Sequence, residues 1–326
     1  MSRFNSRRLA MAATLAATLL AAAGNTLAQS WPDRPVRLVV PFAAGSGADI
    51  VARLYGEQLS TALGQPVVID NKPGASGSIG AEFVARAPAD GYTLLLASQS
   101  THASNPGMFK KLPYDPVRNF DPVSLLGSFP LIIVSNPALG ANSVQDLVAY
   151  ARANPGKLTF AYGTGSAQVS AELFRKIAGT DVLLVPYKSN PLALTGVVAG
   201  ESHAMAIDPG PGLPLIAAGR VRGHAVTTAV RSSVVPNLPT MAEAGFPAYE
   251  LYAWNALMVP AGTPAAVIER LNRELRAIAA KPEFRQKLNA AGIDAQSSTP
   301  AELRRFVEAE LAKWTGHIKA AGMVPE

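Results

Sequence analysis

Three short segments rich in glycine, serine and threonine each follow an apolar run and lead into a helical pattern: residues 44–49, 74–78 and 163–168. The first turn of a helix has free N–H groups and a partial positive charge, and glycine lets an anion approach them closely. A single segment of this kind is often only a tight turn between a strand and a helix. Three of them, at the carboxyl ends of strands, predict an anion site built largely from neutral donors.

The patterns expected for other chemistries are incomplete in this chain. Gly45 and Gly163 each begin a run like the dinucleotide fingerprint G-x-G-x-x-G, but Ile50 and Gln168 stand where the third glycine belongs. Neither a phosphate-binding loop nor the G-x-S-x-G elbow of serine hydrolases occurs. The four histidines are far apart and lack a metal-ligand spacing: His102, His203, His224 and His317. Only His102 falls in a predicted site loop, where a structural role and a ligand contact are both open.

The chain contains no cysteine, which excludes disulfides, thiol catalysis, zinc–cysteine sites and iron–sulfur clusters. No other metal or cofactor signature occurs, so we expect neither. The formal charge of +6 includes three arginines within residues 1–28, and the remaining 26 basic and 23 acidic residues are scattered. Nucleic-acid binding needs a concentrated basic face, so a nucleic-acid partner is not expected.

The first 28 residues have the organisation of an export signal. A basic stretch with Arg7 and Arg8 precedes an apolar run, residues 9–23, and a small-residue end that predicts cleavage after Ala28. The apolar run is shorter than the about 20 residues that a spanning helix needs. We therefore expect a periplasmic protein that is not inserted in the membrane. General secretion and the twin-arginine route both remain open.

The elements that would position the three segments alternate between strand and helix. The 326 residues are enough for two globular units. Apolar runs predict strands at residues 36–40, 67–69 and 93–97, and the helices between them favour an α/β unit with a largely parallel sheet. The pattern restarts near Leu131, and residues 257–260 return to the first unit. The second unit is predicted to contain strands at residues 131–134, 159–161, 182–185 and 225–228.

Capping signals predict where several helices begin. Ser143 and Thr299 each stand three residues before an acidic residue, as in a capping box, and a proline follows Thr299 at the first helical position. The pair Thr263–Pro264 predicts the start of another helix near the C-terminus. These signals concern structure and carry no functional prediction.

In its ordered motifs the chain resembles the solute-binding proteins of tripartite tricarboxylate transporters, also called the Bordetella uptake gene family. The first matching stretches are WPDRPVRLVVPFAAGSGADIVAR from Trp31, GQPVVIDNKPGASGSIGAEFVA from Gly64, PADGYTLLLAS from Pro88 and KKLPYDPVRNFDPVSLL from Lys110. Later stretches are ANPGKLTFA, VPYKSNPLALT, PNLPTMAEAGFP and KAAGMVPE. Together they cover essentially the whole mature chain in order, which makes the resemblance specific.

The resemblance implies an α/β fold of two lobes, a periplasmic binding protein fold of the type II-like class, with the ligand cleft between the lobes. Lobe 1 would be discontinuous, residues 29–130 and 253–326, and lobe 2 would be residues 131–252. Family members mainly bind small organic carboxylates and deliver them to membrane transporter subunits, so a monomer with such a ligand, such partners and no catalytic residues is expected. A sensor-signalling protein and an exported enzyme acting on carboxylates are the alternatives.

By position, the resemblance implies ligand contacts from loops of both lobes. Lobe 1 would offer Phe42, Ala44, Gly45, Ser46, Gly47, Ala48, Asp49, Ser98, Thr101 and His102. Lobe 2 would offer Gly163, Gly165, Ser166, Gln168, Tyr187, Lys188 and Asp208.

Four of these side chains have a second interpretation. Asp49 would repel an anion, so we expect it to fix its loop by hydrogen bonds or to meet a ligand amine. Phe42 and Tyr187 would form apolar walls of the site, or they would pack in the core. Lys188 would pair with a second carboxylate, or it would lie in solvent.

Lobe 2 departs from the family pattern at three places. The loop at residues 162–168 is shorter than usual, with Gln168 where a histidine is frequent, and residues 189–192 differ from the usual Gly-Ser-Ala-Pro type. Residues 205–210 carry Asp208 one position later than the usual aspartate. On a strand, a slip of one residue would turn that side chain to the other face. These departures leave the expected fold unchanged and the ligand open.

Overall fold

The computed structural model describes residues 31–325. The predicted signal peptide, residues 1–28, lies outside the described residues. The chain divides into two units, Met1–Arg34 and Pro35–Glu326, and all the helices and strands described below belong to the second. In the described part of the chain, no helix combines the length and the apolar content needed to cross a membrane.

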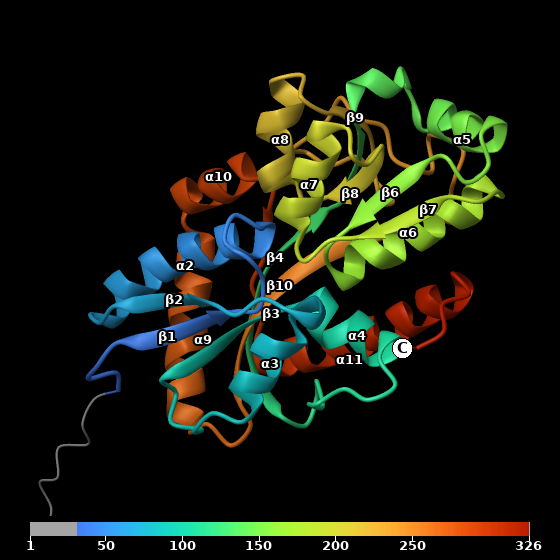
Figure 1. The fold of residues 1–326 in the computed structure, drawn as a ribbon. Helices are drawn as coiled ribbons and strands as arrows, with labels where there is room; N and C mark the ends of the chain where they lie inside the picture. Colours follow the sequence, from blue (N-terminus) through green and yellow to red (C-terminus); the bar gives the residue numbers. More distant parts are fainter. Residues whose placement is uncertain (1–30, 326) are drawn as a thin grey trace, which may run out of the picture. The chain divides into compact units, whose positions relative to one another are not determined.

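The second unit contains two sheets with helices packed around them (Figure 1). Sheet A consists of β1 (Val36–Val40), β2 (Val67–Asn71), β3 (Thr93–Ser98), β4 (Phe120–Pro130), β10 (Tyr252–Pro260) and β11 (Asp294–Ala295). Sheet B consists of β5 (Ile132–Ser135), β6 (Thr159–Tyr162), β7 (Leu183–Pro186), β8 (Ala204–Ile207) and β9 (Arg222–Val226). The helices are α2 (Gly47–Leu63), α3 (Ser78–Ala85), α4 (Asn105–Met108), α5 (Val144–Ala153), α6 (Gly165–Ala178), α7 (Asn190–Ala199), α8 (Pro209–Ala217), α9 (Ala265–Ala280), α10 (Pro282–Ala290) and α11 (Pro300–Ala320), with short helical turns at η1 (Ala75–Gly77), η2 (Ser100–Ser104) and η3 (Pro137–Leu139).

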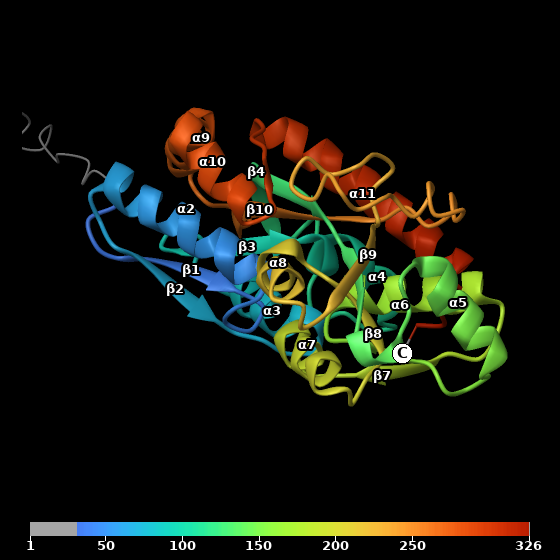
Figure 2. The same ribbon diagram turned by 90° about the horizontal axis from the view of Figure 1, so that it is seen from above.

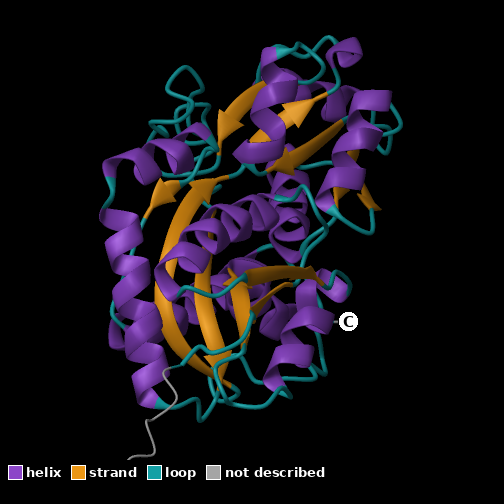
Figure 3. Cartoon of the chain, turned by 90° about the vertical axis from the view of Figure 1, so that its left-hand side faces the viewer, coloured by secondary structure: helices purple, strands orange, loops and turns teal. Residues whose placement is uncertain are grey.

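The three strands from which a largely parallel sheet was predicted, β1, β2 and β3, do pair in parallel, but both complete sheets are mixed. In sheet A the order is β11-β4-β10-β3-β1-β2; β1 pairs in parallel with β2 and β3, whereas β10 runs antiparallel to β3 and β4. The reason is that β10 arrives from far along the chain and inserts between two earlier strands. Figure 3 shows the long strands of this sheet lying together with helices along them.

Sheet B repeats the mixture in the order β7-β6-β8-β5-β9. β6 pairs in parallel with β7 and β8, and β5 runs antiparallel to β8 and β9. Alternate side chains of its strands, such as Ile132, Val134 and Met205, bury themselves against Leu194 and Val197 of α7. Sheet B therefore buries one of its faces in a hydrophobic core of its own.

Two connections run between the sheets, and they are hydrogen-bonded to each other. The chain passes from β4 to β5 through Leu131, and from β9 towards β10 through Thr227, which is fully buried. The Leu131 amide donates to Thr227 Oγ1 at 2.9 Å, and the Thr227 amide donates to the Leu131 carbonyl at 3.0 Å. Leu131 is also where the sequence pattern restarts. The division into lobes at residues 131 and 252 stays a prediction.

The helices begin largely where capping residues predict. Ser143 caps α5, and Thr299 with Glu302 forms the predicted capping box of α11. Thr263 does not cap α9: the N-cap is Pro264, and Thr263 Oγ1 instead donates to the Pro260 carbonyl at 2.7 Å. In Figure 2, α2, α9 and α11 accompany sheet A, while α5, α6, α7 and α8 surround sheet B.

Candidate functional site

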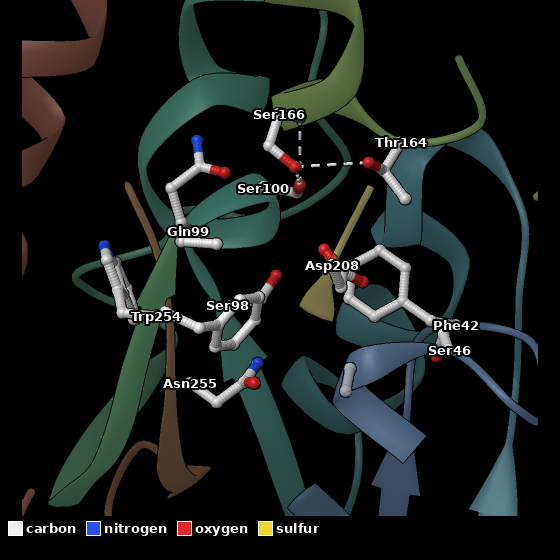
Figure 4. A pocket seen from close by; sticks show the side chains of 13 residues that line it. Phe42, Ser46, Ser98, Gln99, Ser100, Thr164, Ser166, Asp208, Trp254 and Asn255 are labelled. Atoms are coloured by element: carbon white, nitrogen blue, oxygen red, sulfur yellow. Dashed lines mark hydrogen bonds between the residues drawn. The ribbon is translucent and has the colours of Figure 1, made fainter. Parts of the chain in front are cut away.

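A pocket between the two sheets gathers residues from six segments (Figure 4). It encloses about 350 Å³, part of it open to solvent. From the side of sheet A it is lined by Phe42, Ser46, Ala48, Ser98, Gln99, Ser100, Phe129, Ala253, Trp254 and Asn255, and from the side of sheet B by Thr164, Ser166 and Asp208. We call this set the main pocket.

The loop between β1 and α2 is held in shape by Asp49. Its Oδ2 accepts hydrogen bonds from the Gly45 amide at 3.0 Å and from Arg53 Nε at 2.8 Å, and its Oδ1 accepts from Asn71 Nδ2 at 2.9 Å. Burial alone would raise the pKa of Asp49, but its hydrogen bonds and the Arg53 charge prevail and lower it. Of the two roles expected for Asp49, the structure therefore supports the loop-fixing one. Ser46 caps α2 and lines the main pocket.

After β3 the chain forms the π-helical turn η2, and the geometry of this turn sets which side chains point into the pocket. Gln99 and Ser100 line it. Gln99 is 1% exposed, and neither its Oε1 nor its Nε2 has a hydrogen-bond partner among the described residues. A buried amide without partners costs about 1–3 kcal/mol per unmet group, so such a side chain is suited to a bound molecule.

Thr101 and His102, which the sequence places in the site, point elsewhere. Both are fully buried, and neither lines a pocket described here. Thr101 Oγ1 accepts from the Ser98 amide at 3.1 Å and lies 2.8 Å from His102 Nδ1. The His102 ring packs on Phe120 with ring centres 4.9 Å apart, and burial lowers its pKa to about 3, so it stays neutral. Their observed contacts hold the turn after β3 together.

The sheet B side of the pocket begins at the cap of α6. Thr164 Oγ1 accepts from the Ala167 amide at 3.4 Å and lies 3.2 Å from Ser166 Oγ. The Ser166 amide donates to Ser100 Oγ at 3.3 Å, which links the two sides of the pocket (Figure 4). Gly165 makes this approach possible, because a Cβ atom there would lie 2.8 Å from Ser104 Oγ and 3.0 Å from Asn105 Oδ1.

Asp208 provides a second link between the two sides. It follows the last residue of β8 and stands at the N-cap of α8, so the strand alternation considered for it does not apply. Its side chain makes no capping bond to its own helix; Oδ2 instead accepts from the Gly47 amide, in the first turn of α2, at 3.2 Å. Burial raises the pKa of Asp208 to about 6, while the Gly47 hydrogen bond opposes that rise.

Trp254 and Asn255 of β10 form another wall, and a buried carboxylate fixes the indole. Glu310 of α11 accepts from Trp254 Nε1 at 3.0 Å, from Trp314 Nε1 at 3.2 Å and from the Tyr252 hydroxyl at 2.7 Å. The Trp254 indole N–H therefore donates to Glu310 and is not available to a ligand in the pocket. Asn255 is 1% exposed, and within residues 31–325 its Oδ1 has no hydrogen-bond partner.

A second pocket of about 290 Å³ adjoins the first and shares Phe42, Ser46 and Thr164 with it. The predicted glycine-rich segment at residues 74–78 contributes Gly74, Ser76 and Gly77 to it. Other members are Pro41, Ala43, Pro73, Gly163, Lys188, Ser189, Asn190 and Pro191. Lys188 is exposed at its edge, and Gly163 packs so closely on the next loop that a Cβ atom would lie 2.1 Å from the Ser189 carbonyl carbon.

The predicted site residues thus separate into two groups. Those that line one or both pockets are Phe42, Ser46, Ala48, Ser98, Gly163, Ser166, Lys188 and Asp208. Those that line neither are Ala44, Gly45, Gly47, Asp49, Thr101, His102, Gly165, Gln168 and Tyr187. Tyr187 packs against the core of sheet B, where its hydroxyl lies 3.2 Å from Ser202 Oγ. Thr164 lies in the predicted segment 163–168, and the main-pocket residues that the prediction lacks are Gln99, Ser100, Phe129, Ala253, Trp254 and Asn255.

The main pocket can bind an anion without a basic side chain. Its polar groups are hydroxyls, two side-chain amides and the first turns of α2 and α6, both helices longer than twelve residues. Helix N-termini and hydroxyl donors attract a carboxylate, and the aromatic rings of Phe42, Phe129 and Trp254 exclude water from its apolar part. Among the residues described, no cluster of three His, Asp or Glu side chains is arranged to hold a metal ion.

Known proteins resemble this chain in both architecture and sequence. A family model described as the tripartite tricarboxylate transporter family receptor matches residues 51–323. Protein BugT of Bordetella pertussis is 34% identical over 298 residues, which are 90% of this chain and 91% of that protein. The structure of R. palustris Rpa4515 with adipate superposes with a TM-score of 0.89 at 37% identity, over 91% of this chain and 100% of that one. The periplasmic binding protein BugD gives a TM-score of 0.87 at 31% identity, over 91% and 100%, which confirms the predicted fold.

Proposed function

Because the chain belongs to the tripartite tricarboxylate transporter receptor family, we propose that it captures a small organic carboxylate in the main pocket and delivers it to membrane transporter subunits. The likeness to Rpa4515, whose structure contains adipate, supports a carboxylate as the ligand class. The observation that carries the proposal is the unmet amide of Gln99 beside the hydroxyls of Ser100 and Ser166. These groups offer several donors to one carboxylate inside one pocket.

The mode of capture follows from the two-sided lining. Residues 29–130 and 253–326 would form one lobe and residues 131–252 the other, with Leu131 and Thr227 at the connection between them. A ligand that touches both sides stabilises only the closed arrangement, so it shifts the population towards closure. Binding of this kind needs no covalent chemistry, and we propose a monomeric periplasmic receptor, exported by its N-terminal segment, rather than an enzyme.

Ligand binding is tested with the mature protein, from Gln29 onward. Thermal unfolding is followed in the presence of mono-, di- and tricarboxylates, after refolding to remove any molecule that co-purifies. A ligand at 100 times its Kd stabilises by about 2.7 kcal/mol, which raises the Tm by several degrees. Titration calorimetry on each hit then gives the Kd. Failure of every carboxylate to raise the Tm would contradict the proposed ligand class.

The place of binding is tested by Gln99→Leu, which keeps the size of the side chain and removes its amide. We expect the Kd to rise by about tenfold or more, since one lost hydrogen bond to a charged group is worth about 1.5–3 kcal/mol. The Tm of the unliganded variant should not fall, because an unmet buried amide is removed. Gln286→Leu, at an exposed position of α10, is the matched control. Equal affinities for the two variants would place the ligand elsewhere.

A further inference from the structure

The main pocket contains one charged side chain, Asp208, whose role carboxylate binding alone does not explain. Of the residues that line it, Asp208 is the one with an ionisable side chain, and the remaining polar members are neutral hydroxyls and amides. A pocket that binds an anion would be expected to avoid a carboxylate, because like charges repel strongly where water is excluded. Asp208 therefore calls for an explanation in terms of the ligand.

The two carboxylate oxygens of Asp208 are in different situations. Oδ2 accepts the hydrogen bond from the Gly47 amide at 3.2 Å, so this carboxylate occupies a donor in the first turn of α2. A Cβ atom on Gly47 would lie 2.8 Å from Oδ2, which shows how close the two segments are. Across residues 31–325, Oδ1 accepts no hydrogen bond. The pocket therefore offers a negatively charged oxygen that accepts no hydrogen bond from the described residues.

The donors for a ligand carboxylate belong to other segments that line the pocket. Thr164 and Ser166 at the start of α6 form a connected group of hydroxyls with Ser100 of η2, and Gln99 adds an amide without partners (Figure 4). Asn255 Oδ1, a second unmet acceptor, belongs to β10. The pocket thus combines neutral hydroxyl and amide groups with one carboxylate, Asp208, and with the partnerless Asn255 Oδ1.

We propose that Asp208 selects the charge of the ligand: the main pocket takes a monocarboxylate whose other end carries a hydrogen-bond donor, a hydroxyl or an ammonium group, and disfavours a second carboxylate. This inference rests on the proposed function, since it specifies which carboxylates the same site accepts. A donor on the ligand meets Oδ1 of Asp208, which accepts no hydrogen bond from the described residues. A second carboxylate there meets a negative charge.

Lys188 is the residue that would oppose this selection. It lines the second pocket and is exposed, and it is not part of the main pocket. A dicarboxylate that extended past Phe42 and Thr164 would reach the second pocket and its lysine. The selection by Asp208 therefore predicts that Lys188 makes no difference to affinity.

The test compares ligands of equal length at pH 7.5. Adipate, 6-hydroxyhexanoate and 6-aminohexanoate form one set, and succinate, 4-hydroxybutyrate and 4-aminobutyrate form a shorter one. Calorimetric Kd values are measured for the mature protein and for Asp208→Asn, whose side-chain oxygen can still accept from Gly47. We expect a donor-ended ligand to bind the unmodified protein about tenfold or more tightly than the matching dicarboxylate, and Asp208→Asn to reduce this ratio by about tenfold.

Controls separate charge from structure. Asp181→Asn removes an exposed carboxylate next to β7 and should leave the ratio unchanged. Asp208→Ser supplies a second neutral variant should Asp208→Asn fail to fold. Tight dicarboxylate binding by the unmodified protein, or its loss in Lys188→Met, would overturn the charge selection and leave the carboxylate proposal standing. No binding of any member of either set would overturn both.

Discussion

Glu310 allows a sharp prediction because it is a buried carboxylate held by neutral donors. It is 4% exposed and accepts from two indole nitrogens and one tyrosine hydroxyl. In the described residues, no lysine or arginine forms an ion pair with it. One of its donors, Trp254, lines the main pocket, so the carboxylate connects the stability of α11 to the shape of the site.

The predicted effect of Glu310→Leu follows from the donors left behind. Tyr252 is partly exposed and its hydroxyl can turn to water, but Trp254 and Trp314 are at most 1% exposed, so their N–H groups would be orphaned. Each orphaned donor costs about 1–3 kcal/mol, and burying leucine returns about 1–2 kcal/mol. We expect a loss of about 2–4 kcal/mol in the free energy of unfolding. Glu310→Gln keeps one oxygen for both indoles and should lose only about 1 kcal/mol.

Urea unfolding at pH 7.5, followed by circular dichroism, measures these differences. Glu308→Leu is the matched control, because Glu308 lies on the same helix two residues earlier and is exposed. The same variants titrated with a bound carboxylate report whether the position of Trp254 matters for affinity. If Glu310→Leu were as stable as Glu308→Leu, or if the glutamine variant cost as much as the leucine variant, the hydrogen-bond argument would fail.

Three further predictions concern the site. The raised pKa of Asp208 means that the folded state holds this proton more tightly than the unfolded state, so its contribution to stability is complete below about pH 4 and is lost as the pH rises to about 6. Among the described residues, Asp208 accepts one hydrogen bond, from the Gly47 amide, and the nearby acid of α2, Asp49, is paired with Arg53. Asp208→Asn should remove the dependence of the unfolding free energy on pH between about 4 and 6. At pH 7 this variant should be more stable by up to about 3 kcal/mol, as measured by urea titrations at a series of pH values. Gly163→Ala should lower the Tm and weaken binding, since its Cβ atom would overlap the Ser189 backbone, whereas Gly316→Ala, which meets no atom within 4 Å, should leave both unchanged or raise the Tm slightly. Ligand addition should change tryptophan emission in the unmodified protein and in Trp314→Phe but not in Trp254→Phe, because Trp254 is the tryptophan that lines the main pocket; an undiminished change in Trp254→Phe would contradict this.

Local signals predicted the elements that carry them. The run at Val36–Val40, the cap at Ser143 and the capping box at Thr299 depend on residues a few positions apart, and all three are present. The family resemblance, carried by ordered motifs over the whole mature chain, is also confirmed. Signals of this kind survive because the backbone preference and the tertiary structure favour the same conformation.

The elements that sequence patterns missed depend on distant partners. β4 spans eleven residues, yet Pro122, Gly127 and Pro130 interrupt its pattern and suggest turns. It becomes a long strand because β10, from more than a hundred residues later, pairs along its length with two shifts of register. The mixed direction of the sheets has the same origin, since no local pattern reveals where β10 inserts.

Within the site, the loops could be predicted but their inward-facing residues could not. The segment after β3 was expected to contribute Thr101 and His102, and the π-helical turn instead directs Gln99 and Ser100 into the main pocket. A turn with hydrogen bonds from residue i to i+5 rotates each side chain relative to an α-helix or a strand, and no residue in this segment marks it. Asp208 was predicted from the family resemblance despite an uncertain register, and it does line the main pocket, because it lies beyond the end of β8, where strand alternation no longer applies.

The contacts that join the two sides of the main pocket are weak enough for a ligand to control closure. The Ser166 amide to Ser100 Oγ and the Gly47 amide to Asp208 are single hydrogen bonds of 3.3 and 3.2 Å, each worth about 1–3 kcal/mol at most. Enclosing the Gln99 amide without partners opposes these bonds in the absence of a ligand, at about 1–3 kcal/mol per unmet group. A carboxylate that satisfies Gln99 removes this cost only in the closed arrangement, and a difference of a few kcal/mol is enough to shift the population. Replacement of Gln99 by leucine should therefore ease closure without a ligand while it weakens affinity, whereas substitution of Asp208 should change which ligand drives closure.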